Sequence, residues 1–265
     1  MIHSVRQCLY IRLFIGLFIG MFCAAHNALA IVAMESVHLG NPPEGYSGAF
    51  DINAIGEYGN TEKGTLSTGL KVIRKKEVVT QFVMFNYQYG ESGGVRDKNK
   101  AFIHGRHIHQ LTPKYAWEGF AQASSDEFTR LTLRLLLGGG ARLSLWQGSG
   151  TRQGYFGLGG FYEKEKLDLE SSDTADNRTT AWRANAYFVI KTAFNDNVSV
   201  VSTTYYQPNL ERFGDFRAIE DASLVSKLTE KLAAKISLDI SHDSEPPVGV
   251  KQTDTTIKVG LDVSF

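Results

Sequence analysis

The feature of this 265-residue chain that most restricts its fold is a two-residue alternation of apolar and polar side chains. In the last ten residues, TIKVGLDVSF, every second position from Ile257 to Phe265 is apolar. The same period recurs in AFDINAIGEY, in AWRANAYFVIK and in AAKISLDIS. Successive side chains of a strand point to opposite faces, so a period of two predicts strands with one apolar and one polar face.

About twelve such runs can be marked along the chain, and most exceed the roughly 5–6 residues of an average strand in soluble proteins. They match the ~9–11 residues that a tilted strand needs to cross a bilayer. The expected strands lie near 46–58, 65–74, 78–89, 100–110, 115–123, 127–145, 152–165, 180–192, 198–207, 215–227, 232–242 and 254–265.

The connections between these runs alternate between polar, often long segments, such as GESGGVRDKN and PNLERFG, and tight turns, such as LTPK and FNDN. Two rims of different character are typical of an up-and-down membrane barrel. Lipid contact also requires closure, because an open sheet edge cannot satisfy its backbone groups in hydrocarbon. We therefore expect an all-β fold: a closed, antiparallel, up-and-down transmembrane β-barrel of about twelve strands with both termini periplasmic.

The start of the chain has the features of a secretory signal peptide. Arg6 and Arg12 precede an uncharged run at 13–25, and Ala28-Leu29-Ala30 supplies a small-x-small cleavage site. The run is shorter than the ~20 residues of a membrane-spanning helix, although an uncleaved anchor is the alternative. We expect a cleaved signal peptide at 1–30, a periplasmic segment at 31–45 and the barrel at 46–265. Both cysteines, Cys8 and Cys23, would leave with the signal.

Charged residues recur on the polar face of the expected strands, where a barrel has a polar interior. Basic residues outnumber acidic ones on this face, which predicts weak anion preference if the barrel conducts. Paired with one another, they would instead plug it, because wide aqueous channels appear nearer 16–18 strands. The expected lumen charges are Asp51, Glu57, Lys71, Glu118, Arg130, Arg134, Arg142, Arg183, Lys191, Lys235, Asp239, Lys258 and Asp262.

The last strand has an expected role in assembly. Its apolar face, with Val259, Leu261, Val263 and Phe265, would meet lipid, and the strand would pair with the first one to remove the sheet edge. A terminal aromatic residue on such a strand resembles the signal by which barrel-assembly machinery recognises its substrates. We therefore expect Phe265 to serve membrane insertion.

Three segments carry a resemblance to a known family: PPEGYSGAFDINAIGEYGNTEKGTLSTGL, SSDEFTRLTLRLLLGGGARL and SHDSEPPVGVKQTDTTIKVGLDVSF. They resemble the salt-induced outer membrane protein family, and the resemblance covers nearly all of 42–265. It implies an outer-membrane barrel of a Gram-negative bacterium. We expect a salt- or stress-responsive protein that is exported through the general secretory route. The resemblance supplies no catalytic residues.

Two groups of residues invite a search for chemistry. His107 and His109 share a strand face, where two imidazoles could hold one metal ion, while His104 would point to the other face. His242 stands beside Asp243 and Ser244, the residue types of a hydrolase, but neighbours on a strand end point in different directions. We interpret both groups as ordinary barrel and loop residues, and we predict no cofactor, metal site or catalytic residue. An acidic loop at 168–176 is interpreted as solvated.

The expected function is a narrow pore or a structural barrel of the cell envelope, with outer-membrane lipid and lipopolysaccharide as surroundings. The formal net charge of zero gives no argument for nucleic acid as a partner. One alternative is an outer-membrane lipid-modifying or proteolytic enzyme with an active site at its rim. A second is a soluble periplasmic barrel that binds a ligand.

Overall fold

The computed structural model describes residues 42–57, 62–146, 151–169 and 176–264, and these form one antiparallel sheet. The strands hold eleven to sixteen residues each. The expectation of an all-β, antiparallel fold with twelve strands is confirmed. The strands are β1 (Gly45–Glu57), β2 (Lys63–Lys76), β3 (Val79–Ser92), β4 (Val95–Gln110), β5 (Tyr115–Asp126), β6 (Leu131–Leu145), β7 (Arg152–Leu167), β8 (Arg178–Ala193), β9 (Val198–Pro208), β10 (Phe216–Lys227), β11 (Leu232–Asp243) and β12 (Thr253–Ser264).

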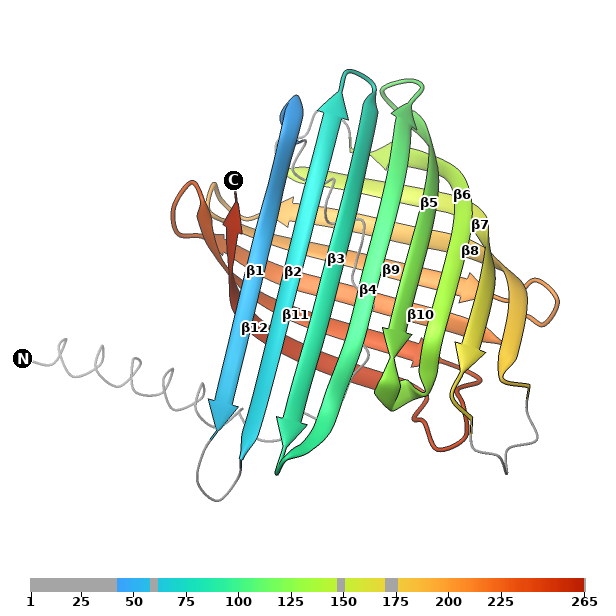
Figure 1. The fold of residues 1–265 in the computed structure, drawn as a ribbon. Coiled ribbons are helices and arrows are strands. Elements are labelled where there is room, and N and C mark those ends of the chain that lie inside the picture. The colour runs from blue at the N-terminus through green and yellow to red at the C-terminus, as the bar shows by residue number, and fades with distance from the viewer. Residues whose placement is uncertain (1–41, 58–61, 147–150, 170–175, 265) are drawn as a thin grey trace, which may run out of the picture.

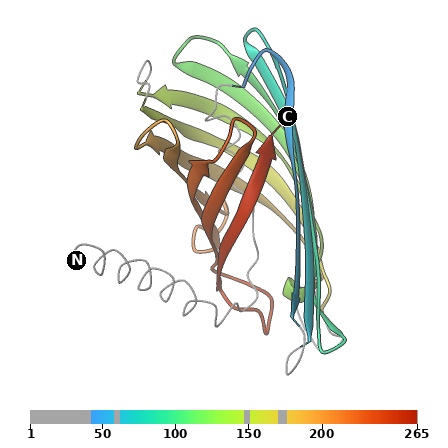
Figure 2. The ribbon, with the colours of Figure 1, turned by 90° about the vertical axis from the view of Figure 1, so that its left-hand side faces the viewer.

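Each strand pairs with its neighbours in the chain, and the sheet curls so strongly that its two ends meet. Figure 1 shows β1–β4 in front and β9–β11 crossing behind them, and Figure 2 shows the curl from the side. β1 and β2 share thirteen register pairs. β1 and β12 are paired at Ala49↔Ser264 and Phe50↔Val263. The last strand therefore pairs with the first one, but over a short stretch only.

The up-and-down order sorts the connections into two rims. The turn rim holds the connections at 77–78, 111–114, 146–151, 194–197 and 228–231, together with the first residue of β1 and the last residue of β12. The loop rim holds the connections at 58–62, 93–94, 127–130, 168–177, 209–215 and 244–252. Among the described residues, no helix is long and apolar enough to cross a membrane.

One expected long loop is a tight turn instead. β3 runs to Ser92 and β4 starts at Val95, so most of GESGGVRDKN belongs to the two strands. Gly93 and Gly94 join them with φ angles of 58° and 75°. A two-residue hairpin turn of type I′ requires positive φ at both central positions, and glycine adopts it without a steric penalty.

The strand expected at 127–145 starts later than its pattern indicates. Phe128 donates its N–H to Asp126 Oδ1 at 3.0 Å, which caps the 3₁₀ helix η2 (Glu127–Thr129). Arg130 follows with a φ of 57°, so it is not a strand residue as expected. A register shift between Leu131 and Leu133 then turns Leu131 inward, where it is buried, whereas its alternation with Leu133 and Leu135 predicts the outer face.

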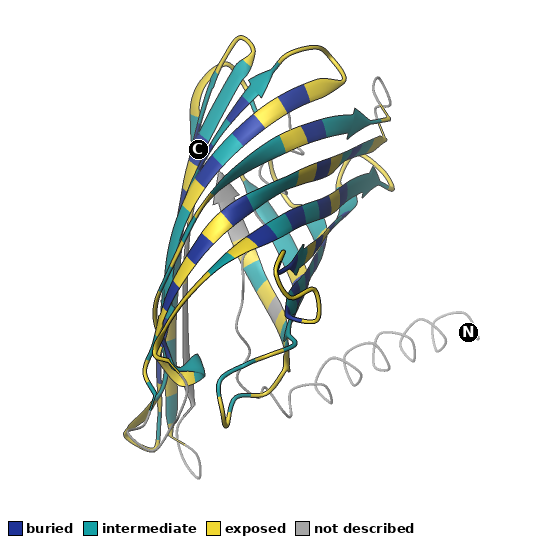
Figure 3. Cartoon of the chain, turned by 90° about the vertical axis from the view of Figure 1, so that its right-hand side faces the viewer, coloured by how far each residue is buried: buried dark blue, intermediate teal, exposed yellow. Residues whose placement is uncertain are grey.

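The two faces of the curled sheet differ as the alternation predicts. Buried and exposed residues alternate along the strands in Figure 3. The outer face exposes large apolar side chains, such as Ile257, Val259 and Leu261 of β12, which are 57%, 63% and 54% exposed. The inner face carries two apolar clusters: Ile73, Phe82, Met84, Phe102, Ile108 and Ala116 on one wall, and Tyr187, Val189, Val201, Tyr205 and Ile219 on another.

Candidate functional site: a charged interior below a vestibule

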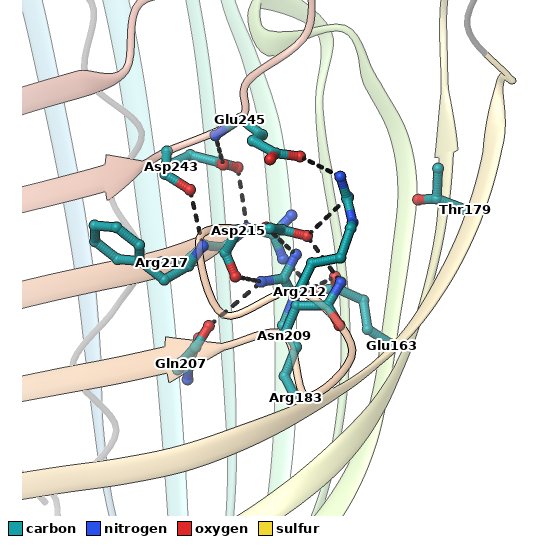
Figure 4. Close-up of polar contacts among 12 residues, drawn as sticks. Glu163, Thr179, Arg183, Gln207, Asn209, Arg212, Asp215, Arg217, Asp243 and Glu245 are labelled. Atoms are coloured by element: carbon teal, nitrogen blue, oxygen red, sulfur yellow. Dashed lines mark hydrogen bonds and ion pairs between the residues drawn. The ribbon is translucent and has the colours of Figure 1, made fainter.

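The centre of the interior is a carboxylate shared by three arginines. Glu163 lies on β7, in phase with the inward-facing Phe161, and both are buried. Arg183 of β8 donates from Nε to Glu163 Oε1 at 2.9 Å. Arg134 Nε lies 3.6 Å from Glu163 Oε2, and Arg217 of β10 donates from Nη1 to the same oxygen. Figure 4 shows several of these contacts.

Arg217 joins this centre to two further carboxylates. Its Nη2 donates to Glu165 Oε1 at 3.0 Å, and its Nε donates to Asp243 Oδ2 at 3.0 Å. Glu165 also accepts a hydrogen bond from Arg134. Buried charges are tolerated only where partners of good geometry compensate for the lost hydration, and each of these groups has several. The network ties β6, β7, β8, β10 and β11 together through side chains.

The connection between β9 and β10 extends the network to the loop rim. Asp215 accepts from Arg183 Nη2 at 2.8 Å and from Asn209 Nδ2 at 2.9 Å. Burial alone would raise the pKa of Asp215, but these hydrogen bonds and the charges of Arg183 and Arg217 outweigh it, so the pKa lies below its ordinary value. Arg212 then bridges Asp215 at 3.3 Å and Glu245 at 3.0 Å, which links two loops.

A cavity of about 460 Å³, the vestibule, lies over this network. Its walls come from the loop-rim ends of several strands and from the connection at 244–252, with Glu163, Arg183 and Arg217 among the lining residues. Neutral amides, including Asn86 and Gln122, line it as well. The vestibule is therefore polar, and most of the charges that line its deeper part are already paired.

The interior narrows sharply beyond the vestibule. The next cavity holds only about 40 Å³, and its lining includes His104 and Arg106 of β4 as well as Tyr205 of β9 and Ile219 of β10. Strands from opposite walls therefore meet around a space that holds at most a few water molecules, each of which needs ≳10–15 Å³. Tyr205 and Ile219 belong to one apolar cluster of the inner face, and His104 stacks on Phe82 and Phe102 of the other.

Beside this narrow part of the interior, Glu118 of β5 links β4 and β8 through hydrogen bonds. Tyr187 of β8 donates its hydroxyl to Glu118 Oε1 at 2.9 Å, and Arg106 donates from Nη1 to Oε2 at 3.2 Å. All three residues are buried. The guanidinium of Arg106 also lies 5.2 Å from the ring centre of Phe120, a cation–π contact.

The structure places the expected lumen charges in three groups. Glu118, Arg142, Arg183 and Asp239 are buried. Lys71, Arg130, Arg134, Lys191 and Lys235 are half-buried. The side chains of Asp51, Glu57, Lys258 and Asp262 lie outside the described part of the chain, as do those of Val263 and Phe265 of the expected assembly signal.

Among the fully buried charges of the described residues, carboxylates outnumber basic groups, whereas five of the expected basic lumen residues are half-buried. Four arginines are buried there, against seven carboxylates. The residues that carry the network were not among the expected lumen charges: Arg106, Glu163, Glu165, Asp215, Arg217 and Asp243. Glu163 and Glu165 were detectable, because they continue the period-two face of Phe161 in GGFYEKEK. Asp215 and Arg217 were detectable too, because they share the period-two face of Ile219 in the strand expected at 215–227.

The three candidate histidines separate onto the two faces. His104 is buried inside, with Nδ1 3.2 Å from Gln122 Oε1. His107 and His109 lie on the outer face against Trp117, with ring centres 5.1 and 5.9 Å from it. Within the described ranges, no three His, Cys, Asp or Glu side chains are grouped so that they could hold a metal ion.

The three residues considered for a hydrolase point to different partners. His242 Nδ1 lies 2.8 Å from Thr253 Oγ1, and Asp243 binds Arg217. Ser244 donates its hydroxyl to the Gly214 carbonyl at 2.9 Å. This arrangement joins β10, β11 and β12 at the loop rim and forms no Ser-His-Asp relay.

Together, the twelve-strand curled sheet, its apolar outer face and its charged interior define an outer-membrane type of β-barrel. The chain belongs to the family described as "Protein of unknown function, DUF481", whose model matches residues 51–265. No curated protein matches it.

Solved structures similar to this chain include a porin and the translocator domain of an autotransporter. The NanC porin has a TM-score of 0.50 at 10% identity, over 82% of this chain and 98% of that one. The translocator domain of the autotransporter NalP from Neisseria meningitidis has a TM-score of 0.48 at 11% identity, over 87% of this chain and 92% of that one. The likeness to the porin shows the fold.

Proposed function

We propose that this protein is a closed outer-membrane β-barrel whose interior is blocked by its own side chains. The turn rim with both termini faces the periplasm, and the loop rim with its vestibule faces the outside. The apolar outer face, the pairing of β1 with β12 and the likeness to a porin support this proposal. The barrel is a structural component of the cell envelope with a blind outer vestibule.

The observation that carries the proposal is the buried Glu163 held by Arg134, Arg183 and Arg217 from three different strands. A barrel of about twelve strands is narrow enough for side chains to fill, whereas open channels are found nearer 16–18 strands. A paired network of this kind resists hydration, because opening it would separate buried charges from their partners. The narrow level around Arg106 and Tyr205 closes the path a second time.

The test is conductance in a planar lipid bilayer. The purified protein is expected to give no ion-conducting steps at moderate voltage, even after insertion has been verified by protease protection. Stable steps of uniform size would instead favour the narrow pore. Their reversal potential in a salt gradient would then test the weak anion preference predicted from the expected lumen charges, which cation preference would contradict.

The compartment is tested separately by fractionation. An outer-membrane barrel is extracted only by detergent and migrates differently on gels before and after boiling. Recovery in the soluble periplasmic fraction would defeat the proposal and favour a soluble ligand-binding barrel. We also propose export through the general secretory route and insertion by the barrel-assembly machinery, into a membrane of lipid and lipopolysaccharide.

Two further parts of the proposal rest on the sequence. Its resemblance to the salt-induced outer membrane protein family supports a stress-responsive role, which is tested by measuring protein levels after a rise in external salt. We propose no enzymatic activity. Replacing His242 or Asp243 by Ala is expected to leave lipid and peptide turnover at the cell surface unchanged. A loss of turnover in either variant would instead favour the enzymatic function.

A further inference from the structure

The outer face near the turn rim carries a row of polar side chains where a lipid-facing surface should be apolar. Arg74 of β2, Gln81 of β3 and His107 of β4 occupy directly paired positions on three neighbouring strands. Arg74 donates from Nη1 to Gln81 Oε1 at 2.8 Å. Gln81 Nε2 lies 3.1 Å from His107 Nδ1. The row is thus a continuous hydrogen-bonded chain across three strands.

Trp117 of β5 extends the row on the same face. Its ring centre lies 5.1 Å from that of His107 and 5.9 Å from that of His109, so the indole contacts both imidazoles. Trp117 is 44% exposed, and its ring is therefore open to whatever surrounds the barrel. We call Arg74, Gln81, His107, His109 and Trp117 the headgroup patch.

The headgroup patch lies where the apolar outer face gives way to the turns. Exposed apolar side chains such as Val72, Val83 and Ile103 continue along the same strands towards the middle of the barrel. In the other direction, Arg74 is three residues from Glu77, or about 10 Å at ~3.3 Å per residue. The turn segment RKKE (74–77) carries three basic residues and one acidic residue. This boundary is where lipid headgroups meet a membrane barrel.

The donors of the headgroup patch are arranged for an anion. Because Arg74 donates to the amide oxygen of Gln81, the amide N–H of Gln81 is the group that faces His107 Nδ1. A neutral His107 then carries its proton on Nε2, which makes that nitrogen a donor directed away from Gln81. A guanidinium and an imidazole N–H therefore flank Gln81, and arginine is well suited to phosphate.

We propose that the headgroup patch binds the phosphate of an anionic phospholipid in the leaflet at the turn rim, an inference that rests on the proposed membrane orientation. Arg74 and His107 hold the phosphate, Gln81 fixes both side chains, and Trp117 lies at the level of the headgroup. A lipid fits better than free phosphate, because the patch is continuous with the apolar face that would hold the acyl chains.

The test uses the purified full-length protein in non-ionic detergent and native mass spectrometry with added lipids. Phosphatidylglycerol is expected to remain bound at collision energies that remove phosphatidylcholine. Arg74→Gln is expected to weaken phosphatidylglycerol binding about tenfold, as for loss of a charge-assisted hydrogen bond. Arg152→Gln is the matched control, because it removes an exposed cation from the same rim outside the patch.

Three results would overturn the inference: equal retention of the two lipids, equal binding by the Arg74 and Arg152 variants, or full displacement of the lipid by inorganic phosphate. Heat-modifiable migration verifies that each variant is folded, and His107→Gln replaces Arg74→Gln if the latter does not fold. Binding in detergent does not depend on orientation, so it can fail while the fractionation experiment succeeds. Recovery of the protein in the soluble fraction would defeat the proposed function itself.

Discussion

Glu118 on β5 and Tyr187 on β8 are joined by a 2.9 Å hydrogen bond across the two strands that lie between them, although they stand 69 residues apart in the chain. β6 and β7 lie between the two residues, and both strands are rich in glycine where the Tyr187 side chain passes over them. A Cβ atom on Gly157 would lie 2.1 Å from the ring of Tyr187. Gly157 therefore has a packing reason: it leaves room for the aromatic ring of Tyr187 against the strand.

Replacing Gly157 by Ala should destabilise the barrel by about 1–3 kcal/mol, the usual cost of an overpacked interior. The added methyl group displaces the Tyr187 ring, and the hydrogen bond to Glu118 is then lost. Gly105→Ala is the control, because a Cβ atom there meets nothing within 4 Å. The measurement is urea unfolding in detergent micelles, followed by tryptophan fluorescence. Equal midpoints for the two variants would contradict this account of the glycines.

Replacing Glu163 by Gln should be more costly, at about 3–5 kcal/mol, because removing one partner leaves buried charges uncompensated. Arg134, Arg183 and Arg217 would then share a smaller negative charge. The comparison is Arg96→Ala, which breaks the Arg96–Glu127 pair, whose side chains are 47% and 44% exposed. An exposed pair contributes only about 0–1 kcal/mol. The same unfolding assay measures both variants, and a smaller loss for Glu163→Gln than for Arg96→Ala would mean that the network is not a stabilising centre.

The strands and their faces could be predicted from the sequence because a period of two is a local property of neighbouring residues. Arg183 and Glu118, for example, could be assigned to the interior from the alternation alone. The pairing of Glu163 with Arg217 could not, because it joins β7 to β10 over 54 residues and depends on how tightly the sheet curls. The bulge at Leu131 could not be predicted either. A register shift changes the face on which a side chain lies, but it leaves the alternation of apolar and polar residues in the sequence unchanged.

Acid should release the connection at 209–215 from the network. The pKa of Asp215 is lowered in the folded protein, so its contribution to stability is complete above the ordinary value of 3.8. It is lost as the pH falls through the lowered pKa. Leu210 and Phe213 are exposed in this connection and are suitable sites for pepsin, which cleaves at low pH. Cleavage there is expected to be slow at pH 4 and fast at pH 2.

The Asp215→Asn variant should be cleaved rapidly at both pH values, because the neutral amide cannot replace the carboxylate that binds Arg183. Asp196→Asn alters an acidic residue in the turn at 194–197, on the other rim, and should behave as the unmodified protein does. The account fails if the unmodified protein and Asp215→Asn are cleaved at the same rate at pH 4.

Opening the barrel should require removal of the aromatic side chains at the narrow level together with a weakened Glu163 network. Tyr187 and Tyr205 have ring centres 5.7 Å apart, and both are buried in the interior. The Glu163 network remains in place when the two tyrosines are removed, so we expect the double variant Tyr187→Ala/Tyr205→Ala to stay silent in a planar bilayer. The triple variant Glu163→Gln/Tyr187→Ala/Tyr205→Ala, which weakens both blocks, is expected to show ion-conducting steps. Glu163→Gln/Tyr206→Ala is the matched control, since Tyr206 is the next residue on β9 but is 46% exposed on the outer face. If this control conducts as well as the triple variant, the two tyrosines do not form a block, and a silent triple variant that is correctly inserted would contradict the two-block account.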